Sequence, residues 1–300
     1  MTDKIIVVAG GTGNLGGRIV KALLEKNAKV RVLVRATSDK EKVSQLERSG
    51  AKIFVVDLTN QQEIANACSG ATCVVSALAG LEDVVIETQK VLLNGAILAG
   101  VARFIPSDFS LDFTKFKDGE NRNLDLRRAF HSYLDTTSIA STTIFNGAFM
   151  DMLTNEIPMI IFKKKLVLYW GDANHKMGFT TLNDTAKFTA NVALDSTTPR
   201  FLRIAGDQIS PQEIREAMNQ LTGQKFRLIR TGGLGLLSFL IKVTKLFSPA
   251  KTDLYPAWQG MQYMRNMMDK RANLKTTDNN RYADMKWTTV KELLSNHKTA

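Results

Sequence analysis

Apolar residues in the first half of the chain gather in short runs that alternate with longer amphipathic segments. The runs are solid rather than alternately apolar and polar, which is typical of strands covered on both faces. They lie at Lys4–Ala9, Val30–Val34, Lys52–Val56, Cys73–Ala77, Arg103–Pro106 and Thr142–Phe145. Segments of helical length separate them, among them Asn14–Lys26, Asp39–Arg48 and Leu81–Ala99. This alternation predicts an α/β fold with a doubly wound parallel sheet.

The pattern becomes less regular after Phe145. We expect a helix over Met150–Ile161, a strand over Lys165–Trp170, a helix over Thr185–Leu194 capped by Asn183 or Asp184, and a strand over Phe201–Ile204. The sequence Ser210-Pro211-Gln212-Glu213 predicts a capping box at the start of another helix, which Gly223 ends. No internal repeat or low-complexity linker separates the two halves.

Three glycines follow the first apolar run at the spacing of a phosphate-binding turn. Gly10, Gly13 and Gly16 precede an amphipathic helix. One glycine permits the tight turn, one lets the backbone approach a diphosphate, and one allows close packing of helix on strand. The diphosphate would bind the N–H groups at the start of the helix. We therefore expect residues 1–148 to form a Rossmann domain and residues 149–300 a smaller, discontinuous substrate lobe, with some strands returning to the main sheet.

Basic residues follow the second predicted strand, where such a domain meets the adenosine ribose. An acidic residue there favours NAD, whereas an arginine accommodates the 2′-phosphate of NADP. Arg35 occupies this position, which favours NADP(H) as the cofactor; a solvated basic loop is the alternative. Asp57 and Leu58 would border the adenine, and residues 76–78 would run beside the middle of the cofactor.

Composition and charge argue against nucleic acid, metal and membrane as partners of this chain. The net charge is +11, but the basic residues are scattered and no nucleic-acid-binding motif accompanies them, so we expect no nucleic acid partner. Cys68 and Cys73 fit no metal spacing, which favours no metal and a reduced, cytoplasmic protein. The apolar stretch Gly232–Ile241 is half the length of a membrane span. We interpret it as a buried or groove-lining helix and expect no membrane partner.

The chain resembles the NmrA-like family, the atypical short-chain dehydrogenases that include isoflavone reductase-like enzymes. The segments that carry the resemblance are AGGTGNLGGRIV, VARFIPSDFS, LRRAF, TIFNGAFMDML, GDANHKMGFTTLNDTAKFTA and DNNRYADMKW. The resemblance implies that Arg35 and a lysine hold the 2′-phosphate; the position in the helix favours Lys42, and Lys40 is the alternative. Ser107 and the segment 146–149 would border the nicotinamide and the substrate. The expected cofactor-binding residues are Gly10, Thr12, Gly13, Asn14, Leu15, Gly16, Arg35, Lys42, Asp57, Leu58, Ser76, Ala77, Leu78, Ser107 and Phe149.

The chemistry is where the chain departs from that family. Isoflavone reductase-like members have a catalytic lysine four residues before an arginine pair, and Asn123 occupies this position here. Asparagine cannot supply a proton as lysine can. Among other proton donors, His175 is the better candidate, because it lies between Trp170 and Phe179 in a loop over the expected cleft. We expect His131 to be solvated on a helix surface, and Tyr169 and Asp108 are weaker candidates. Met261, Met264, Met267 and Met268 indicate a core face or a flexible pocket wall.

Two functions remain open. In the first, the chain is an NADPH-dependent reductase of a small apolar or aromatic carbonyl or enone compound. In the second, it is a non-catalytic regulator that senses NADP(H) and binds a protein partner, the use represented by NmrA itself.

Overall fold

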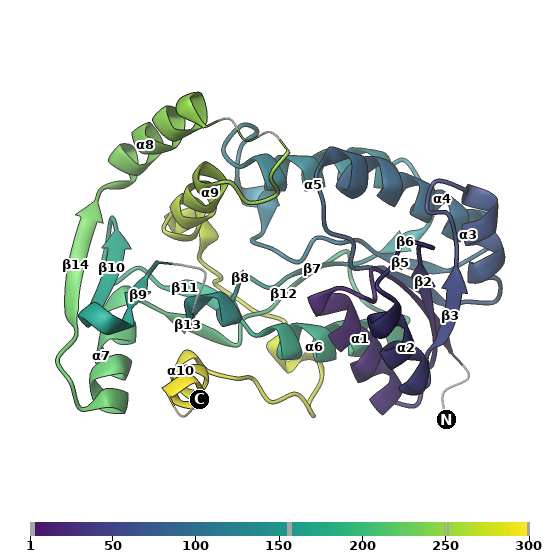
Figure 1. The fold of residues 1–300 in the computed structure, drawn as a ribbon, viewed down its shortest axis with the longest axis horizontal. Coiled ribbons are helices and arrows are strands. Elements are labelled where there is room, and N and C mark those ends of the chain that lie inside the picture. Colours follow the sequence, from purple (N-terminus) through teal and green to yellow (C-terminus); the bar gives the residue numbers. More distant parts are fainter. Residues whose placement is uncertain (1–3, 155–157, 249, 251, 299–300) are drawn as a thin grey trace.

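A parallel sheet of six strands forms the right-hand part of the molecule in Figure 1. The computed structural model describes residues 4–154, 158–248, 250 and 252–298. The strand order is β3-β2-β1-β4-β5-β6, and every neighbouring pair is parallel. The strands are β1 (Ile5–Ala9), β2 (Lys29–Val34), β3 (Lys52–Val55), β4 (Cys73–Ser76), β5 (Arg103–Ile105) and β6 (Ala140–Ser141). This is the Rossmann order, with its crossover point between β1 and β4, and it confirms the predicted fold class.

Helices cover both faces of this sheet. They are α1 (Asn14–Glu25), α2 (Lys40–Arg48), α3 (Gln61–Cys68), α4 (Gln89–Leu98), α5 (Arg122–Leu134) and α6 (Leu182–Leu194). Ile19 of α1 and Phe188 of α6 belong to the apolar core on one face. Ile64 of α3, Leu92 of α4 and Phe130 of α5 belong to the core on the other. The sheet is therefore buried on both sides, as its solid apolar strands require.

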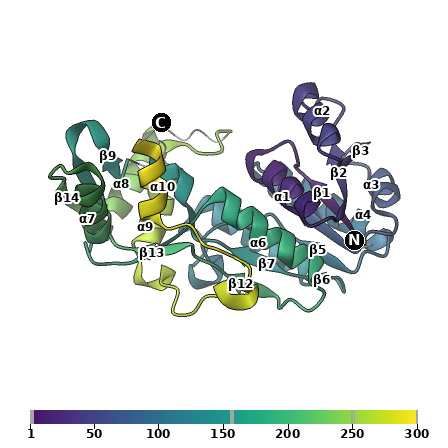
Figure 2. The same cartoon turned by 90° about the horizontal axis from the view of Figure 1, so that it is seen from below.

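The rest of the described residues form short strands and further helices. The strands are β7 (Thr143–Phe145), β8 (Ala148–Phe149), β9 (Ile160–Ile161), β10 (Leu166–Trp170), β11 (Met177–Thr180), β12 (Phe201–Arg203), β13 (Asp207–Ile209) and β14 (Arg227–Gly232). They form the sheets β14-β10-β9, β13-β11-β8 and β12-β7. The helices are α7 (Pro211–Thr222), α8 (Leu234–Phe247), α9 (Ala257–Met267) and α10 (Val290–Lys298). Figures 1 and 2 show β9, β10, β14, α7, α8 and α9 beside the six-stranded sheet, and we call this part of the molecule the second lobe. Helix α6 lies against α1 on one face of the sheet.

Three local expectations for the second half differ from the structure. The helix expected over Met150–Ile161 is a 3₁₀ segment over Met150–Thr154 followed by β9, and residues 155–157 lie outside the described residues. Thr181, not Asn183 or Asp184, caps α6, because its hydroxyl accepts the N–H of Asp184. The apolar stretch after Gly232 is not a buried helix, since only Leu237 and Ile241 of α8 are buried. The capping box at Ser210 and the left-handed Gly223 are confirmed.

Candidate functional site

The glycine turn links the end of β1 to the start of α1. Gly10 has a φ of +83°, and a Cβ there would lie 2.5 Å from the carbonyl oxygen of Ala77. A Cβ on Gly16 would lie 2.1 Å from the carbonyl oxygen of Gly10. Both positions therefore exclude any larger residue, and they hold the start of α1 directly against the ends of β1 and β4. Gly13 and Asn14 are exposed at this point, with Thr12 and Leu15 half-buried.

The first turn of α1 is open for an anion. Gly13 is the N-cap residue, no side chain caps the helix, and its first turn contains no acidic residue. The N–H groups at this positive helix end, directly after the glycine turn, suit a diphosphate. In contrast, side chains cap the starts of α2, α3 and α5.

Two cations stand free beside the end of β2. Arg35 follows this strand directly, and its backbone forms a turn with Ser38 through two hydrogen bonds of 2.9 and 3.0 Å. Lys42 lies in the first turn of α2. Both side chains are exposed, and neither has an ion-pair or hydrogen-bond partner among the residues that the structure describes. Because Asp39 already caps α2, an anion here would have to be held by these two side chains.

The residues after β3 contribute backbone and apolar surface rather than charge. The carboxylate of Asp57 accepts hydrogen bonds from the N–H and the hydroxyl of Thr59, at 2.8 and 2.7 Å. These bonds lower the pKa of Asp57. Leu58 is buried beside them. The Asp57 carboxylate therefore stabilises its own turn.

The ends of β4 and β5 are tied together at the carboxyl edge of the sheet. The Ser107 hydroxyl donates to the carbonyl of Leu78 at 2.7 Å, and the Ser107 N–H donates to the buried side chain of Gln89 at 2.9 Å. Ser76 is fully buried, yet its hydroxyl has no partner among the described residues. Ala77 and Leu78 are half-buried.

Asn146 follows β7 and presents an unused amide. The residue is fully buried, and neither its side-chain nitrogen nor its oxygen has a hydrogen-bond partner among the described residues. Its backbone is held by Ser110 and Thr180 at 3.1 and 2.7 Å. Phe149, three residues later, is half-buried on β8 and packs against the core beneath α1 and α6. Buried amides without partners are rare, so this group and the Ser76 hydroxyl fit a polar ligand along this edge.

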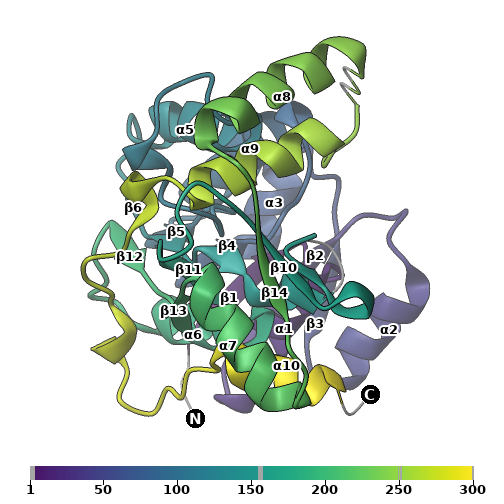
Figure 3. The same cartoon turned by 90° about the vertical axis from the view of Figure 1, so that its left-hand side faces the viewer.

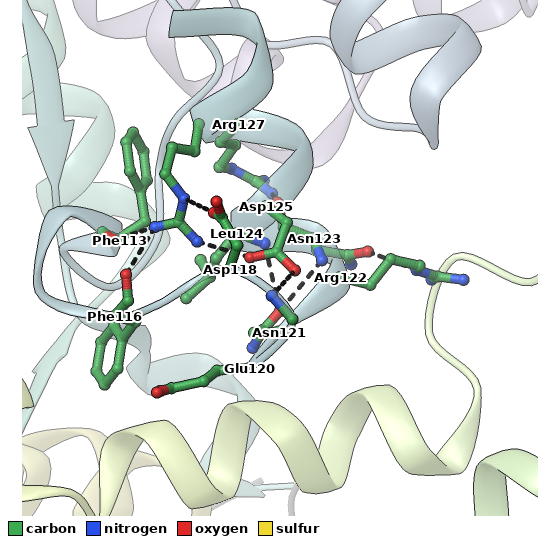
Figure 4. Close-up of polar contacts among 12 residues, drawn as sticks. Phe113, Phe116, Asp118, Glu120, Asn121, Arg122, Asn123, Leu124, Asp125 and Arg127 are labelled. Atoms are coloured by element: carbon green, nitrogen blue, oxygen red, sulfur yellow. Dashed lines mark hydrogen bonds and ion pairs between the residues drawn. The ribbon is translucent and has the colours of Figure 1, made fainter. Parts of the chain in front are cut away.

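Asn123 lies in the first turn of α5, among the polar residues drawn in Figure 4. The residue is buried, and Arg122 donates to its side-chain oxygen at 3.1 Å. Its amide nitrogen donates to the carbonyl of Leu254 at 3.3 Å, and its own carbonyl accepts from Arg127 at 2.8 Å. Asn123 thus joins α5 to the segment that leads into α9.

Tyr263 of α9 extends this polar cluster, and the sequence interpretation missed it. Its phenol lies near Asn123 and near the positive charges of Arg127 and Arg122. Burial raises the pKa of this phenol, and the arginines offset only part of the rise. A periodic signal was available, because the buried polar residues Gln259, Gln262 and Asn266 on α9 follow helical spacing and bond to the start of α5.

His131 is not solvated, contrary to the expectation for a helix surface. Its Nε2 lies 2.5 Å from Oδ2 of Asp108, and Thr143 donates to the same oxygen at 2.8 Å. Phe113 and Phe201 cover the imidazole ring. Burial raises the pKa of Asp108, but His131 and Arg127 outweigh it, so the net pKa lies below the ordinary value. The pair is committed to the interior of the protein.

The remaining candidates are also structural. His175 is buried, and its ring bonds to the carbonyl of Met267 at 2.9 Å. Tyr169 packs half-buried against the core of the second lobe, as does Met264, while Met267 and Met268 belong to that core. Burial raises the pKa of both cysteine thiols to about 12, and no cluster of metal ligands occurs within the described residues.

Comparisons with known proteins place these features in a family. The model of the NmrA-like family matches residues 2–294. Pinoresinol reductase 2 of Arabidopsis thaliana is 32% identical over 214 residues, which cover 64% of this chain and 65% of that protein. The photosystem II assembly factor Ycf39 of Guillardia theta is 26% identical over 213 residues, 67% of this chain and 64% of that protein. The chain therefore aligns with about two thirds of the length of these curated relatives.

Solved structures share the fold over almost the whole chain. The structure of AtPrR2 with NADP⁺ and (+)pinoresinol has a TM-score of 0.82 at 22% identity, covering 99% of both chains. The quinone oxidoreductase QOR2 of Escherichia coli, complexed with NADPH, has a TM-score of 0.75 at 15% identity, covering 98% of this chain and 100% of that one. No helix within the described residues is long and apolar enough to cross a membrane. With a family match from residue 2 to residue 294, this chain belongs to the NmrA-like family.

Proposed function

We propose that this protein is an NADPH-dependent reductase of small apolar or aromatic carbonyl or enone compounds. The observation that carries the proposal is the open N-terminus of α1 together with the unpaired Arg35 and Lys42 at the end of β2. The helix end suits the diphosphate, and the two cations suit the 2′-phosphate. Relatives with the names pinoresinol reductase and quinone oxidoreductase, the latter complexed with NADPH, support this class of reaction.

The carboxyl edge offers groups for the rest of the cofactor. The unpaired Ser76 hydroxyl and Asn146 amide fit the polar groups of a dinucleotide, and Phe149 adds an apolar surface beside them. When bound, NADPH would supply the hydride. The residues of the chain would orient the cofactor, exclude water and provide a proton to the substrate oxygen.

For that proton we propose Tyr263 rather than the residue at the position of the family lysine. The side chain of Asn123 has no acidic proton and is already bonded to Arg122 and Leu254. The phenol of Tyr263 is protonated at neutral pH, as that of an ordinary tyrosine is, and it lies near Asn123. General acid catalysis typically contributes about 10²–10⁴-fold to a rate.

The test is NADPH oxidation by the purified protein with a panel of quinones, enals and aromatic ketones. We expect turnover above the background without substrate, and a loss of about 10²-fold in kcat for Tyr263→Phe with unchanged NADPH affinity. Tyr133→Phe is the matched control, because that phenol bonds to Asn94 at the opposite end of α5. Asn123→Lys asks separately whether the family lysine raises the rate.

The second candidate function is that of a regulator that senses NADP(H). The structural hydrogen bonds of the Asn123 side chain favour it, because this residue stands where the family has a catalytic lysine. The name assembly factor of one relative is consistent with a role other than turnover. This function would be supported if neither wild type nor Asn123→Lys oxidised NADPH with any compound while a protein partner co-purified in a cofactor-dependent way.

A further inference from the structure

Helix α8 exposes most of its apolar side chains. Only Leu237 and Ile241 are buried, whereas Leu236 is 49%, Phe239 61%, Leu246 76% and Phe247 82% exposed. Large apolar residues exposed singly are ordinary, but a contiguous group marks an interaction site. Four on one short helix therefore need an explanation.

The exposed residues lie along one stripe of the helix. Phe239 lies three residues after Leu236, Leu246 seven residues after Phe239, and Phe247 eleven residues after Leu236, and each of these spacings returns to about the same face of an α-helix. Leu237 and Ile241 occupy the opposite face, and α8 packs there against α9, where Thr244 approaches Met261. No other described element of the chain packs against α8 closely enough to cover the stripe.

The surroundings of the stripe are uniformly basic. Between Glu216 and Asp253 the sequence contains six basic residues and no acidic residue. Arg227 and Arg230 on β14 and Lys242 on α8 are exposed, and none forms an ion pair among the described residues. Lys245 lies 5.1 Å from the centre of the Trp258 ring. β14 is the edge strand that leads into α8, and Figures 1 and 3 show both at the same end of the molecule.

The exposed apolar stripe and the exposed cations together indicate which kind of surface could cover α8. A second copy of the chain, meeting α8 on α8, would place the same unpaired cations against each other. An anionic lipid surface satisfies both features, since Phe and Leu side chains enter the acyl boundary while Lys and Arg meet the headgroups. A helix of 14 residues is about 21 Å long, too short to span the bilayer but sufficient to lie in its interface.

We propose that α8, with the cations of β14, is a docking surface for an anionic membrane. The sequence interpretation excluded a membrane partner because the apolar stretch is too short to span. That reasoning does not apply to a helix that lies along the surface. This inference is independent of the proposed reductase activity.

The test is sedimentation of the full-length protein with vesicles. One set contains phosphatidylcholine alone and the other equal parts of phosphatidylcholine and phosphatidylglycerol, each at low and high salt. We expect binding to the anionic vesicles that weakens in high salt. Arg230→Gln with Lys242→Gln should weaken binding about 25-fold, at about fivefold for each cation. Phe239→Ser with Phe247→Ser should weaken it by roughly tenfold or more.

Matched control variants distinguish binding through α8 from non-specific binding through exposed apolar residues elsewhere. Val55→Ser and Leu98→Ser remove apolar residues that are 65% and 54% exposed elsewhere, and both should leave binding unchanged. The proposal is overturned if wild type does not bind anionic vesicles, or if the Phe239/Phe247 variant binds as wild type does. It is also overturned if wild type is a dimer that this variant dissociates, because a second copy then covers α8. Unchanged NADPH affinity and circular dichroism show that the variants are folded.

Discussion

At the scale of single residues, the cofactor preference should depend on Arg35. Its guanidinium is exposed and unpaired within the described residues, next to the end of β2. Hydrogen bonds to charged groups contribute roughly 1.5–3 kcal/mol each. Arg35→Ala should therefore weaken NADPH binding about ten- to a hundredfold and leave NADH binding nearly unchanged. Titration of wild type and variant with both cofactors measures this difference.

Arg48→Ala is the control for a general loss of charge. Arg48 lies at the far end of α2 and is already paired with Glu41 at 3.0 Å. Its removal should affect neither cofactor. Equal affinity of wild type for NADH and NADPH, or an equal loss of both in Arg35→Ala, would show that Arg35 does not select the cofactor.

Residues differ in how much of their environment the sequence reveals. The role expected for Gly16 depends on Gly10, six residues away within one strand–helix unit, so the glycine spacing alone was informative. His131 was misjudged because its cover comes from Phe201, seventy residues later, and from the loop that contains Phe113. Tyr263 was missed because its neighbour Asn123 lies on another helix.

At the scale of elements, the start of α7 gives a direct test of capping. Ser210 accepts the N–H of Glu213 at 3.2 Å, and Glu213 accepts the N–H of Ser210 at 2.8 Å. Ser210→Ala should lower the free energy of unfolding by about 1 kcal/mol. Urea unfolding measures the change. Ser44→Ala, inside α2, is the control and should be neutral or slightly stabilising; an equal loss in both variants would rule out a capping effect.

Elements with local signals were predicted well, and those that depend on distant partners were not. The parallel strands and the helices between them each carry their own apolar pattern. β8 and β9 have only two residues each, and they exist because β11 and β10 pair with them. The run Met150–Ile161 has helical composition. Its last two residues form β9 instead, because β10 pairs with them.

At the scale of the whole molecule, acid stability should depend on the Asp108–His131 pair. The pair connects the end of β5, helix α5 and β7, and Arg200 extends it to the start of β12 through a 2.9 Å contact with Nδ1 of His131. The folded pKa of Asp108 lies below its ordinary value. This carboxylate therefore stabilises the fold above pH ~3.9, the value of an unperturbed aspartate, and its contribution disappears as the pH falls through the lower folded pKa.

Asp108→Asn should consequently lower the free energy of unfolding by about 3 kcal/mol near neutral pH, because it removes a buried carboxylate that is hydrogen-bonded to His131 and Thr143. The difference in free energy of unfolding between wild type and variant should shrink as the pH falls below ~3.9. Wild type then loses the stabilisation from the ionised Asp108 carboxylate, which the variant lacks at every pH. Urea unfolding across this range measures both curves. Asp118→Asn is the control, because Asp118 pairs with Arg128 while its own side chain is 86% exposed. A constant gap between wild type and Asp108→Asn at every pH would mean that the charge of Asp108 contributes nothing, and that only its shape and hydrogen bonds hold these elements together.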